Sequence, residues 1–399
     1  MGMGIKINNR YYKFKAFMFV YWAMMLSIMG MYTMYIAEIG FTKRQISIAV
    51  SMLICSSFIS QNIFGYLADR FRSIRRLMII SNVIGIILSI ILKFSQSTTT
   101  VYMIIFAWGF FLYGTVPLSE AWYMGILRES GDDREFGIIR GIGSVGYGLS
   151  GILLGILLNQ FGWEIYSYYI TISTIINLII VLMIEESNDI VDIKGESISI
   201  SEALRQIIRI RPLRTMVLII FIYNFVLRGI YSYLGILVMD FGGGPISLGF
   251  AYFFDAAPEV ITFALSTRLL AKYRDRDLIF IAFIMQIIRL SLILVFNSPI
   301  AIIVLGSFSG IAFGFLATAY KTFIYDVAPD KYKVSCLSLS ESIIGLSGVI
   351  SAPVFGFLFV KFDGHIAIAI GLLIYVILAI VLGINLYAPK GAKDAEVEC

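Results

Sequence analysis

Long apolar stretches separated by short polar segments cover almost the whole chain. Twelve of them approach or exceed the roughly 20 residues that a helix needs to cross the hydrocarbon core of a bilayer. They are residues 16–37, 45–67, 77–94, 101–125, 136–158, 165–184, 214–238, 247–270, 278–297, 299–323, 334–360 and 365–387. A backbone in lipid must satisfy its own hydrogen bonds, so we expect helices and not strands. The pattern predicts an all-α membrane protein with twelve transmembrane helices.

The longest polar stretch, residues 185–213, follows the sixth run and is rich in charged residues and Ser. It divides the chain into an N-terminal six-helix half (1–184), a cytoplasmic linker loop (185–213) and a C-terminal six-helix half with a short cytoplasmic tail (214–399). A basic segment after the second run, residues 65–76, has a fainter counterpart after the eighth, residues 268–276. The two halves therefore read as pseudo-repeats, the layout of transporters that rock about a site at the midplane.

Basic residues are distributed unevenly between the two sides of the membrane. Of the 31 Lys and Arg residues, the loops on one side hold only Lys43, Arg44, Lys93 and Lys361. Because basic loops stay in the cytoplasm, both termini are expected there, in a multi-pass protein of the cytoplasmic (inner) membrane. The net charge of +5 thus reports topology and not a nucleic-acid partner.

The composition excludes most catalytic chemistry. The chain is 59% hydrophobic and 14% charged, against roughly 25% charged residues in soluble domains. It has one histidine and three cysteines without a metal-binding or disulfide spacing, and it lacks a nucleotide-binding Gly-x-x-x-x-Gly-Lys motif. We expect no enzyme activity, metal or cofactor, and a proton gradient as the driving force.

The segment after the second run carries a glycine, a spaced aspartate and a basic cluster: Gly65, Asp69, Arg70 and Arg75. At this position the pattern resembles the signature of the major facilitator superfamily, which implies that superfamily's twelve-helix fold. Glycine allows close helix packing, and the aspartate can cap a helix and pair with arginine across a cytoplasmic gate. The alternative is a simple positively charged membrane anchor.

Charged residues inside the apolar runs are the candidate site, because each is costly in a membrane. Glu120 lies in run 101–125, and Arg140 and Tyr147 lie two turns apart on one face of run 136–158. An acid and a guanidinium can bond sugar hydroxyls while the ring covers the apolar side of the sugar. The alternative is an ion pair that only ties two helices together.

Residues 117–121 and 135–147 resemble the lactose permease family of oligosaccharide:proton symporters. This resemblance implies that Glu120 and Arg140 bind the sugar and that Tyr147 stacks on it. Arg289 looks like the arginine of that family's proton-coupling network. The histidine and glutamate that the family uses in its tenth helix are absent from residues 306–314.

Two acids in run 247–270 offer a substitute for the missing coupling residues. Asp255 and Glu259 are four residues apart on one face, with Pro258 between them. Two close carboxylates in a low dielectric favour retention of a proton, and Arg289 is their expected partner. The alternative is a static network that neutralises Arg228 and Arg289.

Arg228 in run 214–238 forms a polar stripe with Asn224 and Tyr231. We expect Arg228 and Asn224 to face substrate, and a fixed positive charge would also suit an anionic solute. The alternative role of Arg228 is a counter-ion for Asp255 or Glu259.

Together these features predict a proton-coupled symporter of a sugar or similar small polar solute, working by alternating access as a monomer in the lipid bilayer. A nucleoside or aromatic-acid symporter and a drug:proton antiporter remain alternatives. A non-transporting membrane sensor is the alternative from another class.

Overall fold

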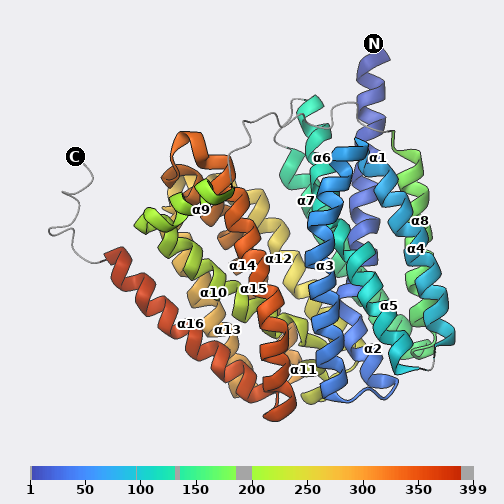
Figure 1. Cartoon of the computed structure of the whole chain (residues 1–399). Coiled ribbons are helices and arrows are strands. Elements are labelled where there is room, and N and C mark those ends of the chain that lie inside the picture. The colour runs from blue at the N-terminus through green and yellow to red at the C-terminus, as the bar shows by residue number, and fades with distance from the viewer. Residues whose placement is uncertain (1, 96, 131–134, 186–199, 388–399) are drawn as a thin grey trace.

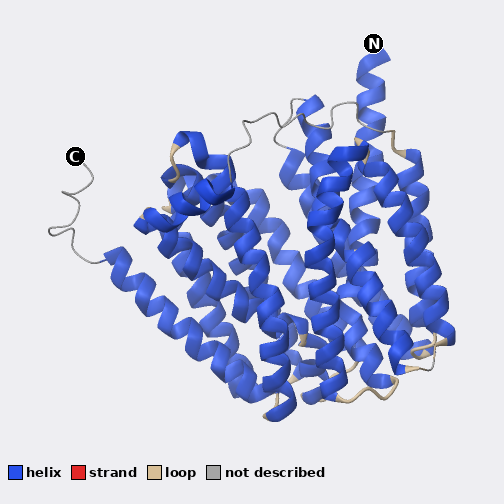
Figure 2. Ribbon diagram, viewed as in Figure 1, coloured by secondary structure: helices blue, strands red, loops and turns tan. Residues whose placement is uncertain are grey.

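The computed structural model describes residues 2–95, 97–130, 135–185 and 200–387, and every regular element in that part is helical (Figure 2). It contains 12 helical segments long and apolar enough to cross a membrane, which confirms the twelve predicted spans. The first six spans are built from α1 (Gly2–Leu26), η1 (Ser27–Met31), α2 (Tyr32–Glu38), α3 (Lys43–Phe71), α4 (Ile74–Phe94), α5 (Thr98–Phe111), η2 (Tyr113–Thr115), α6 (Val116–Ser130), α7 (Glu135–Phe161) and α8 (Ile165–Met183). After the linker helix α9 (Ile200–Arg209), the last six are built from α10 (Arg211–Ser232), α11 (Leu234–Asp240), α12 (Pro245–Lys272), α13 (Asp275–Phe296), α14 (Pro299–Val327), η3 (Asp330–Tyr332), α15 (Lys333–Lys361) and α16 (Gly364–Tyr387).

Short polar segments end one helix and start the next. Thr42 caps α3 in a capping box: its side chain accepts from the Gln45 backbone N–H, and the Gln45 side-chain oxygen accepts from the Thr42 backbone N–H. Ser298 accepts from a backbone N–H in the first turn of α14, and Pro299 occupies its first position. Such caps satisfy backbone groups that a helix end leaves unpaired, so tight turns can join neighbouring spans.

Three spans that the sequence predicts as continuous are interrupted. The first contains the π-helical turn η1, the fourth contains the 3₁₀ turn η2, and the seventh breaks at Tyr233. Around η1, the carbonyl of Ser27 accepts from the Tyr166 hydroxyl at 2.7 Å and that of Gly30 accepts from the Tyr252 hydroxyl at 3.1 Å. Because tyrosines provide partners for these carbonyls, the irregular turn is tolerated inside the bundle.

The segment predicted as a linker loop contains the helix α9. Ala203 and Ile207 are buried, and the Tyr332 hydroxyl donates to Glu202 Oε1 at 3.1 Å. The linker is therefore packed against the C-terminal half where the structure describes it.

The two six-helix halves lie side by side (Figure 1). The start of α1, the helix α9 and the end of α16 lie at one end of the bundle, which we call the inner end, while α2 and α11 lie at the opposite, outer end. The main contacts between halves are made by α7 against α12 and by α3 against α15. Any site between the halves is built on these two helix pairs.

Candidate functional site

The helices α7 and α12 approach each other closely because small residues line their contact. A Cβ atom added to Gly151 would lie 2.9 Å from the carbonyl oxygen of Gly249, closer than real side chains come. Glycine at such a contact lets two helix backbones pack directly. The N- and C-terminal halves are therefore joined along this pair.

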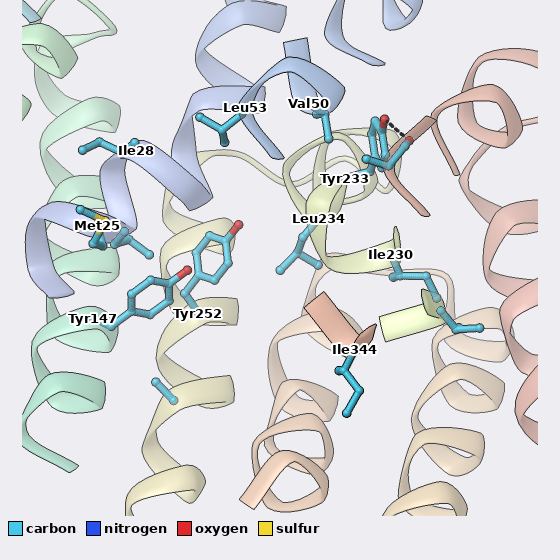
Figure 3. Close-up of a cluster of buried hydrophobic side chains, with 14 of the residues drawn as sticks. Met25, Ile28, Val50, Leu53, Tyr147, Ile230, Tyr233, Leu234, Tyr252 and Ile344 are labelled. Atoms are coloured by element: carbon cyan, nitrogen blue, oxygen red, sulfur yellow. Dashed lines mark hydrogen bonds between the residues drawn. The ribbon is translucent and has the colours of Figure 1, made fainter. Parts of the chain in front are cut away.

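The outer end is closed by contacts between the halves. Lys43 at the start of α3 forms an ion pair of 2.8 Å with Asp240 at the end of α11. The Tyr233 hydroxyl lies 3.4 Å from Ser47 Oγ and donates to the Ala352 carbonyl at 2.8 Å, within the buried cluster of Figure 3. These bonds link α3 to the C-terminal half.

Three tyrosines, Tyr147, Tyr231 and Tyr252, form a cluster near the middle of the bundle. The ring of Tyr252 lies 5.6 Å from each of the other two rings, and the hydroxyls of Tyr147 and Tyr231 are 3.2 Å apart. Figure 3 shows Tyr147 and Tyr252 next to each other. Since Tyr147 belongs to one half and the other two tyrosines to the other half, the cluster joins the halves.

A cavity of about 120 Å³ lies between the halves, on the inner side of Tyr252. Five elements line it: α1, η1, α7, α10 and α12. The lining residues are Trp22, Met29, Arg140, Ser144, Tyr147, Tyr231, Asp255, Ala256 and Glu259. Arg140, Tyr147, Asp255 and Glu259, four of the residues that the sequence singles out, thus meet at one place.

Arg140 is held by contacts from both halves. Its Nη2 atom lies 3.3 Å from Glu259 Oε1 in an ion pair whose side chains are 15% and 13% exposed. Its Nη1 atom donates to Ser144 Oγ at 3.3 Å, and its guanidinium carbon lies 5.0 Å from the centre of the Trp22 ring. The cavity therefore contains a mostly buried ion pair that spans the two halves.

The predicted meeting of Glu120 with Arg140 is not found in this conformation. Glu120 on α6 is half-buried, lies outside the cavity lining, and forms no ion pair within the part of the chain that the structure describes. Arg140 pairs with Glu259 instead, because the close α7–α12 contact brings these two helices together.

Asp255 and Glu259 both face the cavity, but they have different partners. Glu259 is paired with Arg140, whereas Asp255 lies near Tyr231 and Ser309 and within electrostatic range of Arg289. The Oδ1 atom of Asp255 is buried and has no hydrogen-bond partner among the described residues. The expected arrangement of two acids around Arg289 is therefore not found: Glu259 is paired with Arg140, and Asp255 has no ion-pair partner among the described residues.

Arg289 lies in the core of the C-terminal half and not in the cavity. It is 4% exposed, donates to Gln286 Oε1 at 3.3 Å, and leaves its Nε atom without a partner in the described structure. Its predicted role as a direct partner of the two acids is not seen here, since it acts on Asp255 only at longer range.

The polar stripe predicted on α10 divides into two parts. Asn224 is 7% exposed and donates to the carbonyl of Ile220 on its own helix at 3.0 Å, so its amide group is not offered to the cavity. Arg228 is exposed, and its stem passes the backbone of α15 at Gly348.

The described hydrogen bonds of the predicted gate residues lie within their own half in this conformation. Arg75 donates to the carbonyls of Val181 and Leu182 at 3.2 and 2.7 Å, which ties it to the end of α8. Asp69 and Arg70 are exposed. A Cβ atom on Gly65 would meet nothing within 4 Å, so the close packing predicted for this glycine is not found here.

Several residues of the site were missed in the sequence. Trp22 and Met29 line the cavity from the first span, and Tyr252 packs against the lining residue Tyr147, but single aromatic or apolar residues in a membrane helix carry no signal of their own. Ser144 lies one turn after Arg140 and was detectable by that spacing.

The chain was compared with known families and structures. Residues 11–370 match the model of the MFS_1 like family. A mutant of the nucleoside transporter NupG has a TM-score of 0.80 at 15% identity, covering 95% of this chain and 100% of that one. A second NupG structure has a TM-score of 0.76 at 16% identity, covering 95% and 99%. Among curated proteins, no sequence matches.

Proposed function

The chain belongs to the MFS_1 like family of membrane transporters, and from that premise we propose that it takes up a small polar solute together with a proton by alternating access. The fold expected from the superfamily signature is confirmed. The narrower likeness to the lactose permease family stays a prediction.

The ion pair between Arg140 and Glu259 is the observation that supports this proposal. It joins the two halves at 3.3 Å inside a cavity and is mostly buried. A guanidinium stays charged at all physiological pH values, whereas a carboxylate can take up a proton. Only Glu259 can therefore change the charge of the pair.

A proton and a solute act on this pair in the same direction. Protonation of Glu259 removes the negative partner of Arg140 and frees guanidinium donors for solute oxygens. Solute bound to Arg140 in turn leaves Glu259 without its cation, which favours protonation. Such mutual dependence between two ligands is coupling in the thermodynamic sense.

The walls of the cavity suit a solute with a polar ring. Trp22 and Tyr147 offer aromatic faces, while Arg140 and Ser144 offer hydrogen-bond donors, the combination that binds a sugar. Glu120 on α6 is proposed to contact the solute in another state of the cycle. Asn224 is proposed to do the same once its side-chain amide no longer donates to the carbonyl of Ile220. A nucleoside is the second candidate, because structures of a nucleoside transporter match 95% of this chain.

Asp255 and Arg289 are proposed to tune the proton site from the C-terminal half. In the state in which the outer end is open, the inner side is proposed to be closed by Gly65, Asp69, Arg70 and Arg75. We propose that the inner end faces the cytoplasm, so that both termini lie in the cytoplasm and the protein lies in the cytoplasmic (inner) membrane.

Uptake into proteoliposomes tests the proposal. Purified protein is given labelled sugars and nucleosides with and without an inward proton gradient, and uphill accumulation is expected only with the gradient. The double variant Asp255→Asn, Glu259→Gln is expected to lose uphill accumulation while retaining exchange of labelled for unlabelled solute. Equal accumulation by this variant, or proton-driven efflux in place of uptake, would contradict the proposal.

The matched control is Glu341→Gln. Glu341 on α15 is also an acid in an ion pair, with Lys321 at 3.0 Å, but these side chains are 40% and 52% exposed. This variant is expected to transport like the wild type. Absence of any counterflow in the wild type would favour a non-transporting sensor.

A further inference from the structure

Arg228 differs from the other membrane arginines in its surroundings. It lies on α10 one turn before the cavity residue Tyr231, is exposed, and lies close enough to Tyr320 of α14 for electrostatic interaction. A Cβ atom on Gly348 of α15 would lie 3.1 Å from Arg228 Cδ and 3.5 Å from its Nη1, and 3.8 Å from Ile54 of α3. The guanidinium therefore lies at the boundary between the two halves, where the glycine leaves it room.

No protein group neutralises this charge in the described structure. The Arg228 guanidinium makes no hydrogen bond or ion pair there. Arg140 has Glu259, Lys321 has Glu341 and Lys43 has Asp240. A charged residue within a membrane span is energetically costly and for that reason indicates a functional site. All five N–H donors of this guanidinium are available to a ligand.

The nearby acids are already engaged. Glu259 is bonded to Arg140, and Glu341 is bonded to Lys321 and accepts from the Tyr320 hydroxyl. Asp255 lies near Arg289 and Tyr231. Glu120, in the opposite half, is the only other acid within reach of Tyr320 that forms no ion pair among the described residues.

We propose that Arg228 binds an anionic group of the solute, a carboxylate or a phosphate, so that the transported class is polar-ring compounds bearing a negative charge. A guanidinium holds such groups through two parallel hydrogen bonds. The offset of three residues between Arg228 and Tyr231 corresponds to about 4.5 Å along the helix. Arg228 lies outside the cavity lining, but its neighbour Tyr231 lines the cavity with its hydroxyl 3.2 Å from that of Tyr147. In the proposed pose the solute ring lies against Tyr147 and the anionic group extends past Tyr231 to Arg228. This inference rests on the proposed solute site at Arg140 and Glu259.

Matched pairs of neutral and anionic solutes test the inference. The probes are glucose and glucuronate, uridine and uridine monophosphate, and benzyl alcohol and benzoate, measured by thermal stabilisation of purified protein and by competition for uptake. The anionic member of at least one pair is expected to bind about 10-fold more tightly than its neutral partner, as one charge-assisted contact predicts. Arg228→Gln is expected to remove this preference, and Arg228→Lys to retain part of it.

Arg214→Gln is the matched control, because it removes the same charge from the same helix. Arg214 is exposed at the inner end of α10 and donates to the Ile208 carbonyl at 2.9 Å, so the preference for the anion is expected to persist. If Arg228→Gln weakens neutral and anionic members equally, or has no effect, the inference is overturned while the proposed function stands. Arg228→Gln is also combined with Glu120→Gln to test for an ion pair between these residues in another state. If the second substitution restores transport that the first has abolished, Arg228 pairs with Glu120 in an inner gate, and the inference is also overturned. If no probe of either kind is bound or transported, both fail.

Discussion

Replacement of Glu259 by glutamine isolates the contribution of the central ion pair. The substitution keeps the shape of the side chain and mimics its protonated state. At 3.3 Å and an effective dielectric of about 20, the gross attraction between the charges is about 5 kcal/mol. Most of this is offset by desolvation, and the pair contains no hydrogen bond, because Glu259 Oε1 has no hydrogen-bond partner among the described residues. We take about 1 kcal/mol as its net contribution, the upper value for ion pairs in contact with solvent.

This contribution of about 1 kcal/mol is what a solute no longer has to overcome when it takes Arg140 from its partner. Glu259→Gln is therefore expected to bind solute about 5-fold more tightly. Binding in the wild type is expected to strengthen as the pH falls, because protonation of Glu259 has the same effect as the substitution. The variant is expected to have lost most of this pH dependence and all uphill accumulation.

The assay is equilibrium binding of labelled solute to purified protein between pH 5 and pH 8, with uptake into proteoliposomes measured in parallel. Glu341→Gln serves as the control, since its exposed ion pair lies outside the cavity lining. A Glu259→Gln variant that binds more weakly than the wild type, or that keeps the full pH dependence, would refute the reasoning.

Three further substitutions test how the halves are held. Gly151→Leu is expected to abolish transport, because even a Cβ atom there meets the backbone of α12 at 2.9 Å. Gly383→Ala on α16 is the control, because its Cβ atom makes only an ordinary contact of 3.7 Å with Phe280, and uptake is expected to be unchanged. Uptake rates of the two variants decide this. Lys43→Gln removes a partly exposed ion pair at the outer end, worth about 0.2–1 kcal/mol. It is expected to raise the labelling of a cysteine introduced at the outer end at most a few-fold, and complete labelling would contradict this estimate. Arg75→Gln loses two bonds to carbonyls of α8 and is expected to lower the melting temperature without changing solute affinity; an affinity change with intact stability would count against its role within one half.

These tests separate two functions of the residues between the halves. Gly151 and Lys43 hold a conformation in which the outer end is closed. Arg140 and Glu259 hold each other in the cavity. Only substitutions of the second kind are expected to change the pH dependence of binding.

The sequence alone determined the twelve spans and the division into two halves. Both depend on properties of consecutive residues, namely the length of an apolar run and the position of a polar linker, so no knowledge of packing was needed. The same holds for the charged candidates: Arg140, Asp255 and Glu259 stand out because charge is rare in a membrane span, and all three line the cavity.

Local deviations from regular helix were not predicted. The turn η1 and the helix α9 depend on distant partners, such as Tyr252 for the carbonyl of Gly30 and Tyr332 for Glu202. A pattern of apolar residues does not contain these partners, because they come from other helices.

Only the tertiary structure decided which charges meet. The sequence grouped Arg140 with Glu120, an acid of the preceding span, but the packing of α7 on α12 at Gly151 brings Arg140 to Glu259. Arg228 lies beside Gly348 of α15 and has no acid partner among the described residues. Proximity in a helical bundle depends on which faces pack together, and here that choice places an ion pair between the two halves.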